Sequence, residues 1–572
     1  MAIVPLVVMS LVSAAPAALH DHTASGVVFH DANADGVRQT GENGIAGVAV
    51  TNGRDVVRTD ARGRYTLPVT DDTIITVIKP AGYQVPLDGY RLPQHSYIHK
   101  PAGSPDEGFI FPGVEPTGPL PESIDFGLTG SPEDETFSVI VFGDPQPYSH
   151  EDVGFFRRDV IDPLTEFGDA GEPGNRYGAV FGISLGDLVG DQLELFGPLN
   201  QAQAMLGVPW YNVYGNHDMN FLSGDSSLTA DDPDRYADET FERIYGSPNY
   251  AFQYGNAHFI VLDNVIYQGF DGFRDGEFEL WPDGRKPTTG NYRGGLRPEQ
   301  IDFVRNYLAG VPREDLIVLA FHIPIEGGGV HRIPEQRELF EALSSHPNTL
   351  SLSGHTHFQR HWFFGPEHGY DPGQPGPLAA AQPNRFDEPV HHHLNAVTAS
   401  GSWYRGTFDE YGIPNTQMRD GAPNGYTLLH IDGNRYTTEF RASRRAADHQ
   451  MSVSVNDANG KLTANIFNGA EGDAVHYRLL DPAAGSASWR PMAFAPGPDP
   501  LFAASHERET GQATSDAFFN RPVPRPQDAH HLWTADLPAL PVGRTVAVEI
   551  RHLDLYGTER THTHTISNLA QD

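Results

Sequence analysis

The chain has 572 residues, with 39 basic and 74 acidic side chains and a formal net charge of −35. This length exceeds what one hydrophobic core supports, so two to four domains are expected. The negative charge repels polyanions and argues against a long nucleic acid as partner, whereas a small phosphorylated substrate held by metal ions is compatible with it. Solubility in a salty or exposed environment is the simplest explanation of the acidity. The lack of cysteine excludes disulfides.

The first residues match a secretory signal peptide. An apolar run over residues 1–14 is followed by Ala15-Pro16-Ala17-Ala18. The run has the length of a signal-peptide core and is too short to span a bilayer, although no lysine or arginine precedes it. We predict a signal peptide over residues 1–19 and a secreted or periplasmic protein without a transmembrane segment.

Residues 24–130 alternate short apolar runs with turn residues. Strand-forming runs at 26–29, 48–51, 64–69 and 73–78 are separated by Gly, Asp, Asn and Pro. This spacing is typical of a small β-sandwich, so we predict an N-terminal, Ig-like β-sandwich here.

One connection of this sandwich, residues 31–42, matches the ligand pattern of a calcium loop. The expected ligands are the side chains of Asp31, Asn33, Asp35 and Glu42 and the carbonyl of Val37. Strands flank this loop, whereas helices flank an EF-hand loop. A calcium-stapled turn, similar to those in the repeat domains of bacterial surface adhesins, and an acidic turn without an ion both fit the pattern.

Residues 135–443 alternate strands with helices, which predicts a mostly parallel, covered sheet. Helices are expected at 152–167, 193–206, 297–308 and 334–343, and a hairpin at 250–262 implies a mixed or doubled sheet. From residue 448 onward strand patterns return, at 451–455, 462–466, 474–479 and 545–550. They predict a C-terminal β-domain over residues 448–572.

Ligand-type side chains follow five of the predicted core strands. They are Asp144 with Gln146, Asp187, Asn216-His217-Asp218, His322, and His355 with His357. Because ligands bind at the carboxyl ends of strands in open α/β sheets, we expect these side chains to lie together. A single histidine or strand-end aspartate is usually structural, but the joint pattern favours a metal centre. Oxygen and imidazole donors without thiolate suit Mn²⁺, Mg²⁺, Zn²⁺ or Fe²⁺.

These blocks resemble the calcineurin-like metallophosphoesterase superfamily, whose motifs run Asp-x-His, Gly-Asp, Gly-Asn-His-(Asp/Glu), His and Gly-His-x-His. The resemblance covers residues 135–443 and implies an α/β (α+β) fold with a four-layer αββα core. The flanks resemble the N-terminal and C-terminal β-domains of one bacterial branch of that superfamily.

Position by position, the resemblance implies two metal ions bridged by Asp187. Metal one would be held by Asp144, Gln146, Asp187 and His357, and metal two by Asp187, Asn216, His322 and His355. Gln146 stands where the superfamily carries histidine. Since an amide oxygen is a harder donor than imidazole, metal one is expected to favour Mn²⁺ or Mg²⁺. The Asp-x-Gln form also resembles manganese-dependent nucleotide-diphosphate pyrophosphatases, and Val189 and Gly190 replace the metal-binding tyrosine of purple acid phosphatases.

Two cations about 3.5–4 Å apart can bind the phosphoryl oxygens and acidify a bridging water, and the resulting hydroxide attacks phosphorus. In this scheme His217 donates a hydrogen bond or proton to the leaving oxygen, and Asp218 orients its imidazole. A helix N-cap is an equally good expectation for Asp218. For Asp191 a loop hydrogen bond is expected.

Substrate contacts are expected on loops that combine aromatic rings with arginines. Tyr292 with Arg293 and Trp403 with Arg405 have this character, and loop packing explains them equally well. The three histidines at 391–393 are expected at a polar strand start rather than at a metal ion.

The sequence thus predicts a metal-dependent phosphoesterase that hydrolyses a phosphodiester or phosphoanhydride of a small organic phosphate. A phosphomonoesterase with the same site is the alternative. From another class, a surface binding protein with a vestigial metal site also fits, and a nuclease acting on polymers is disfavoured by the net charge. The expected cofactors are two divalent ions, Mn²⁺ foremost, with calcium as a further candidate in the N-terminal domain.

Overall fold

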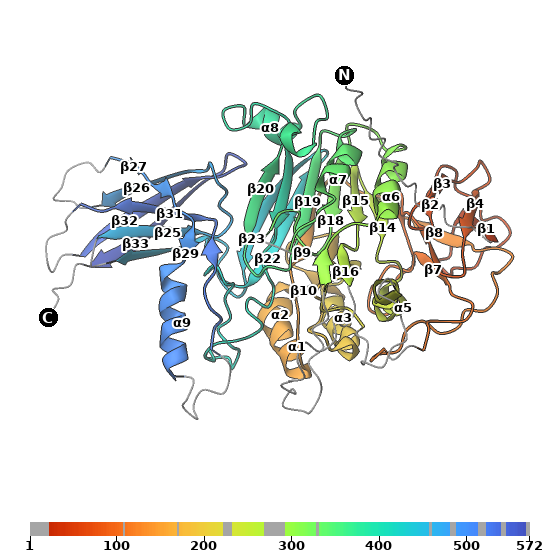
Figure 1. Ribbon diagram of the computed structural model, residues 1–572, viewed down its shortest axis with the longest axis horizontal. Helices are drawn as coiled ribbons and strands as arrows, with labels where there is room; N and C mark the ends of the chain where they lie inside the picture. Colours follow the sequence, from red (N-terminus) through yellow and green to blue (C-terminus); the bar gives the residue numbers. More distant parts are fainter. Residues whose placement is uncertain are drawn as a thin grey trace, which may run out of the picture.

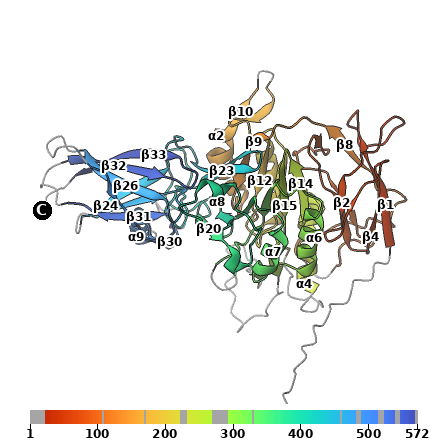
Figure 2. The same cartoon turned by 90° about the horizontal axis from the view of Figure 1, so that it is seen from above.

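The computed structural model describes residues 22–106, 109–168, 171–220, 232–267, 292–327, 331–456, 460–480, 488–512, 522–538 and 545–567. Three bodies follow one another along the long axis: an N-terminal β-domain, a central α/β body and a C-terminal β-domain (Figures 1 and 2). The predicted signal peptide at residues 1–19 lies outside the described residues. Within the described ranges, no helix combines the length and apolar character that a membrane crossing requires.

Two sheets face each other in the central body. One has the strand order β13-β12-β9-β22-β23 and the other the order β14-β15-β18-β19-β21-β20. The first comprises β9 (Thr136–Phe142), β12 (Phe181–Ser184), β13 (Trp210–Asn212), β22 (Gly425–Asp432) and β23 (Arg435–Ala442). The second comprises β14 (Tyr250–Tyr254), β15 (Ala257–Val261), β18 (Leu316–Ala320), β19 (Thr349–Ser353), β20 (Arg360–Phe364) and β21 (His391–Asn395).

The strands that precede the predicted ligands run parallel within each sheet. In the first sheet β12 pairs in parallel with both β9 and β13, and in the second sheet β18 pairs in parallel with β19. Their carboxyl ends therefore meet at one edge of the facing sheets.

Apolar side chains hold the sheets together and cover their outer faces. Val141, Ile183 and Val318 belong to the fully buried layer between the sheets. Each such side chain contributes roughly 1.5–3 kcal/mol by its removal from water. The outer cover of the first sheet includes α1 (His150–Phe156) and α3 (Phe196–Ala204), and that of the second includes α6 (Pro298–Leu308) and α7 (Gln336–Leu343). This is the expected four-layer αββα arrangement.

The two end domains are pairs of sheets. The N-terminal sheets have the orders β4-β1-β8-β6 and β3-β2-β5-β7. Their strands are β1 (His22–His30), β2 (Ala49–Thr51), β3 (Val56–Arg58), β4 (Arg64–Val69), β5 (Thr73–Val77), β6 (Tyr83–Gln84), β7 (Ser96–His99) and β8 (Phe126–Gly130). The C-terminal sheets have the orders β24-β25-β31-β28 and β27-β26-β32-β33. Their strands are β24 (Met451–Asn456), β25 (Lys461–Ile466), β26 (Ala474–Leu480), β27 (Arg490–Pro491), β28 (Ala493–Phe494), β31 (Leu532–Asp536), β32 (Thr545–Leu553) and β33 (Glu559–Ser567).

Several predicted elements are confirmed and others differ. The helix at 297–308 and the hairpin at 250–262 correspond to α6 and to the pair β14–β15. The helix expected over 152–167 is shorter, because its last residues form β10 (Thr165–Phe167) paired with β11 (Pro173–Asn175). Helix α9 (Pro500–Gln512) escapes prediction because its sequence carries no apolar stripe of helical period.

Candidate metal centre

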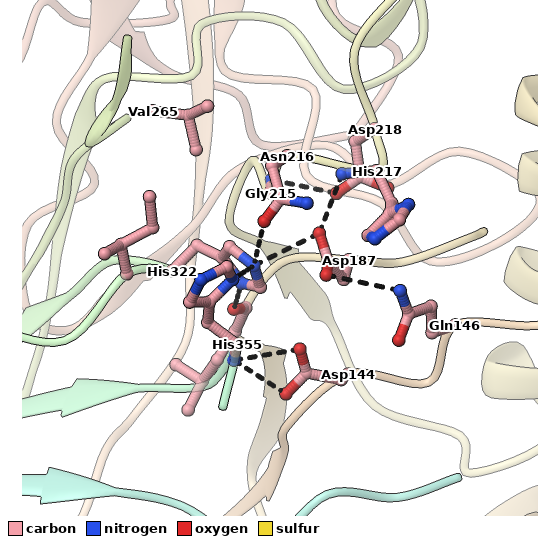
Figure 3. Close-up of polar contacts among 12 residues, drawn as sticks. Asp144, Gln146, Asp187, Gly215, Asn216, His217, Asp218, Val265, His322 and His355 are labelled. Atoms are coloured by element: carbon pink, nitrogen blue, oxygen red, sulfur yellow. Dashed lines mark hydrogen bonds and ion pairs between the residues drawn. The ribbon is translucent and has the colours of Figure 1, made fainter. Parts of the chain in front are cut away.

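The predicted ligands converge in the loops after β9, β12, β13, β18 and β19, and Asp187 lies at their centre (Figure 3). One carboxylate oxygen of Asp187 is 3.1 Å from Nε2 of His322. Its other oxygen is 3.4 Å from the amide nitrogen of Gln146. The two oxygens of one buried carboxylate therefore face two different groups of side chains.

On one side of Asp187, three more donors surround a common point. Nε2 of His322 lies 3.1 Å from Oδ1 of Asn216 and 3.1 Å from Nδ1 of His355. One ligand atom from each of Asp187, His322 and His355 lies within 4.8 Å of the others. This spacing suits one divalent cation with mixed nitrogen and oxygen ligands.

On the other side of Asp187 lie Asp144, Gln146 and His357. Oδ1 of Asp144 is 3.9 Å from Nε2 of His357, and both carboxylate oxygens of Asp144 accept hydrogen bonds from the main-chain N–H of His355 at 2.9 and 3.0 Å. Asp144 and His357 are almost fully buried. All the residues predicted for the two metal ions are thus gathered around Asp187.

Main-chain carbonyls set the tautomers of two of the histidines. Nδ1 of His322 donates to the carbonyl of Leu185 at 2.8 Å, and Nδ1 of His357 donates to the carbonyl of Gly401 at 2.6 Å. Because Nδ1 is engaged by a main-chain carbonyl in each case, Nε2 is the nitrogen that faces the carboxylates. This is the second-shell arrangement common to metal-binding histidines.

The backbone of these loops is unusually constrained. Among the described residues, eleven that are not glycine have positive φ, and six of them lie here: Asp144, Gln146, Asp187, Asp191, His355 and His357. Close approach also explains a glycine, because a Cβ at Gly215 would lie 2.0 Å from the main-chain nitrogen of Asp187. Such strain tends to persist where side chains must be held for function.

Burial and neighbouring charges shift the pKa values of side chains at the centre in opposite directions. Burial raises the pKa of Asp144 to about 7. Burial alone would lower the pKa of His322, but the Asp187 carboxylate raises it to about 9. The proton on His322 supplies positive charge among the carboxylates, and a divalent cation would take its place, so metal binding here releases a proton.

Gln146 is held by a contact that the sequence does not predict. The indole N–H of Trp403 donates to Oε1 of Gln146 at 2.6 Å. Since an indole N–H can only donate, this bond fixes the amide orientation and turns its nitrogen toward Asp187. Oε1 of Gln146 therefore has one lone pair left for a metal ion, because the other accepts the hydrogen bond from Trp403.

The predicted partner of His217 is wrong. Nδ1 of His217 lies 2.6 Å from Oδ1 of Asp191, not beside Asp218. The Asp218 carboxylate instead accepts main-chain N–H groups of Leu188, Val189 and Gly215 at 2.9–3.2 Å. Asp218 ties the loops after β12 and β13 together, and those three bonds leave its carboxylate turned away from the imidazole.

Three family models match the chain. The model for calcineurin-like phosphoesterase matches residues 137–359. The model for the N-terminal part of calcineurin-like phosphoesterases matches residues 32–111, and the model for their C-terminal part matches residues 393–559. The chain belongs to the calcineurin-like phosphoesterases. It is therefore a metal-dependent phosphoric ester hydrolase, and the predicted superfamily, flanking domains and enzyme class are confirmed.

A solved structure similar to this calcineurin-like phosphoesterase is the purple acid phosphatase PPD1 isolated from yellow lupin (Lupinus luteus) seeds. The two are 11% identical, with a TM-score of 0.34 over 69% of this chain and 67% of that chain. The comparison with curated proteins gives no significant match.

Around the metal centre of this phosphoesterase lie the residues predicted to contact substrate. The ring of Tyr292 is 5.9 Å from that of His355, and the ring of Trp403 is 4.4 Å from that of His357. Arg405 lies 4.9 Å over the Trp403 ring, and Arg293 donates to the Gly294 carbonyl at 3.0 Å. Both aromatic residues thus border the site, and Trp403 also orients Gln146.

Sequence reasoning misses one neighbour of the centre. Nδ1 of His331 lies 2.8 Å from Nε2 of His355, whereas His322 contacts the other ring nitrogen of His355, Nδ1. His331 belongs to the glycine-rich segment after β18, where no strand end or motif marks it. Only the path of the folded loop brings it to His355.

Proposed function

We propose that this phosphoesterase hydrolyses a phosphodiester or phosphoanhydride bond in a small organic phosphate, with two divalent cations bound on either side of Asp187. The observation that carries the proposal is the position of Asp187, whose two oxygens face His322 at 3.1 Å and Gln146 at 3.4 Å. A carboxylate so placed can bridge two cations. Metal one would be held by Asp144, Gln146, Asp187 and His357, and metal two by Asp187, Asn216, His322 and His355.

When bound, the cations supply Lewis acidity that polarises the phosphoryl oxygens and lowers the pKa of water. The chain supplies proton transfer to the leaving group. Burial alone would lower the pKa of His217, but Asp191 and Asp187 raise it to about 10. With Nδ1–H donated to Asp191, the protonated ring can give its Nε2 proton to the departing oxygen. The side chain of His217 is 23% exposed, so a substrate can reach it.

Charge near the site favours a diester over a monoester. Arg293, which borders the site through its neighbour Tyr292, lies 3.9 Å from the Glu335 carboxylate, which offsets its charge. A diester brings one negative charge to phosphorus, whereas a monoester dianion brings two and needs more cationic partners. Mn²⁺ is the favoured ion because the donor set combines two amide oxygens and two carboxylates with imidazoles.

The division of the chain and its location belong to the same proposal. We assign residues 24–130 to the N-terminal sandwich, 135–443 to the phosphoesterase domain and 448–572 to the C-terminal β-domain. The apolar run and small residues at 1–19 support a signal peptide, and hence a secreted or periplasmic enzyme.

The test compares bis-p-nitrophenyl phosphate with p-nitrophenyl phosphate as substrates of metal-stripped protein after addition of Mn²⁺, Mg²⁺, Zn²⁺ or Ca²⁺. We expect Mn²⁺ to restore hydrolysis, the diester to react faster, and Asp187→Asn to abolish the restored activity while the protein stays folded. A faster monoester reaction would assign a phosphomonoesterase instead. Folded protein that no metal activates toward either ester would contradict the proposal.

A further inference from the structure

The N-terminal domain contains a second group of oxygen donors, in the loop that follows β1. Main-chain hydrogen bonds close the neck of this loop: the N–H of His30 donates to the carbonyl of Asn43 at 2.9 Å, and that of Ile45 to the carbonyl of Val28 at 2.8 Å. The ends of the segment 31–42 are thereby held side by side, so its first and last carboxylates are brought together.

Side chains of the loop turn inward onto its own backbone. Oδ2 of Asp31 accepts the N–H of Gly36 at 2.8 Å, and the oxygens of Glu42 accept the N–H groups of Ala32 at 2.9 Å and Gln39 at 2.8 Å. Oδ1 of Asp35 accepts the N–H of Val37 at 2.9 Å. Gly36 allows the sharp turn with a φ of +74°. Asp31, Asp35 and Glu42 are thereby folded back onto the backbone of one short loop.

One oxygen in this group lacks a partner. Asp31 is 1% exposed, and its Oδ1 atom is buried without any hydrogen-bond donor. Its other oxygen accepts the N–H of Gly36 within the loop. A buried, unpaired carboxylate oxygen is costly, and a cation placed among the loop oxygens would remove that cost. Hydrogen bonds already made do not prevent this, because a carboxylate oxygen has more than one lone pair.

We propose that residues 31–42 bind one calcium ion through Asp31, Asn33, Asp35, the Val37 carbonyl and Glu42. Calcium accepts six to eight oxygen ligands in flexible geometry, which a loop of mixed carboxylate, amide and carbonyl donors provides. Mg²⁺ demands a tighter octahedron and keeps its waters, so it fits this loop less well. The site is separate from the catalytic centre and does not depend on the substrate proposed above.

Calcium at this position lies beside β8, the strand that leads into the catalytic body. Asp31 donates its N–H to the carbonyl of Leu128 at 3.0 Å, and β1 pairs in parallel with β8 from Val28–Phe126 to His30–Leu128. Strand β8 ends at Gly130, shortly before β9 begins at Thr136. The ion thus stabilises the end of the sandwich from which the chain enters the phosphoesterase domain.

The test measures calcium binding by equilibrium dialysis and thermal unfolding on the chelator-treated full chain. Wild type is compared with Asp31→Asn, with Glu42→Gln and with the matched control Glu122→Gln, which removes an exposed carboxylate of the same domain outside the loop. We expect wild type and the control to bind one calcium equivalent more than the two loop variants. Their unfolding temperature should rise with calcium, and that of the loop variants should rise less.

Calcium bound at the catalytic centre contributes equally to all four proteins, so the difference reports the loop alone. Equal calcium stoichiometry in wild type and in Glu42→Gln would overturn the proposal. Circular dichroism establishes that each variant is folded. If Asp31→Asn does not fold, the half-buried Glu42→Gln decides the outcome. An equal rise in the unfolding temperature with Mg²⁺ and with Ca²⁺ would overturn the assignment to calcium.

Discussion

At the scale of single residues, the structure adds one contact to what the motifs predict: His217 pairs with Asp191. The 2.6 Å contact fixes which nitrogen of His217 faces Asp191 and keeps the ring protonated. Asp191 acts through His217 and is therefore a positioning residue. The loss of activity on replacing Asp191 should therefore be larger for a leaving group that must be protonated to depart.

We predict that Asp191→Asn lowers the hydrolysis of an alkyl phosphodiester by about 10²–10⁴-fold, the usual range for loss of general acid catalysis. Hydrolysis of bis-p-nitrophenyl phosphate should fall only a few-fold, because nitrophenolate leaves without protonation. Steady-state kcat on both esters checks this, with His217→Gln as a reference that should show the same split. Equal losses on the two esters would mean that Asp191 has only a structural role.

The residues that were predictable share a local signature, and the others do not. Asp187, Asn216 and His355 each follow a buried strand and a glycine, so their place at the sheet edge follows from the sequence alone. The partners Asp191 and Trp403 depend on how loops cross in space. Asp218 shows the limit clearly, because its place next to His217 in sequence suggests a contact that three main-chain N–H donors prevent.

At the scale of elements, strand β21 departs most from its sequence pattern. Its histidines 391–393 begin the strand, as expected, yet all three are fully buried between β19 and the edge strand β20. Neighbouring strands satisfy them: Ser351 of β19 contacts both His391 and His393 at 2.7 Å, and the hydroxyl of Tyr436 contacts His392 at 3.0 Å. Polarity in the sequence predicts exposure only where such partners are missing.

This buried strand should make the protein sensitive to acid. Burial lowers the pKa of His391 to about 3, while an unfolded histidine titrates near 6.5. Below pH of about 6.5 the unfolded chain takes up protons that the folded chain does not, so the free energy of unfolding falls as pH falls. Each such histidine contributes up to about 1.4 kcal/mol per pH unit.

Urea unfolding between about pH 7 and about pH 5, with chelator present, measures this dependence. His391→Gln should reduce the slope of unfolding free energy against pH, whereas His150→Gln, at an exposed helix start, should leave it unchanged. Identical slopes in wild type and His391→Gln would show that the buried strand is not the source of acid sensitivity.

At the scale of the whole molecule, a buried histidine–aspartate pair connects the C-terminal domain to a loop beside the catalytic centre. Nε2 of His531 lies 2.9 Å from Asp420, and its Nδ1 lies 2.7 Å from Oδ1 of Asn465. The imidazole of His531 thus lies between two buried oxygen atoms, one from each domain. Asp420 also accepts the N–H of Gln359 at 2.7 Å, and its neighbour Arg419 donates to the carbonyl of His357 at 2.9 Å. The loop that carries His357 is thus held from the C-terminal domain.

We predict that His531→Ala weakens metal binding although the residue touches no ligand directly. The change leaves the buried Asp420 carboxylate without this hydrogen-bond partner, which typically destabilises a protein by about 1–3 kcal/mol. The loop of His357 then loses support, so half-maximal activation should require about 10-fold more Mn²⁺, in line with other second-shell changes. Saturating Mn²⁺ should restore most of kcat.

The matched control is His564→Ala, on the edge strand β33 of the same domain, and it should leave the Mn²⁺ requirement unchanged. A lower unfolding temperature of His531→Ala with an unchanged Mn²⁺ requirement would show that the C-terminal domain stabilises the fold without positioning the metal ligands.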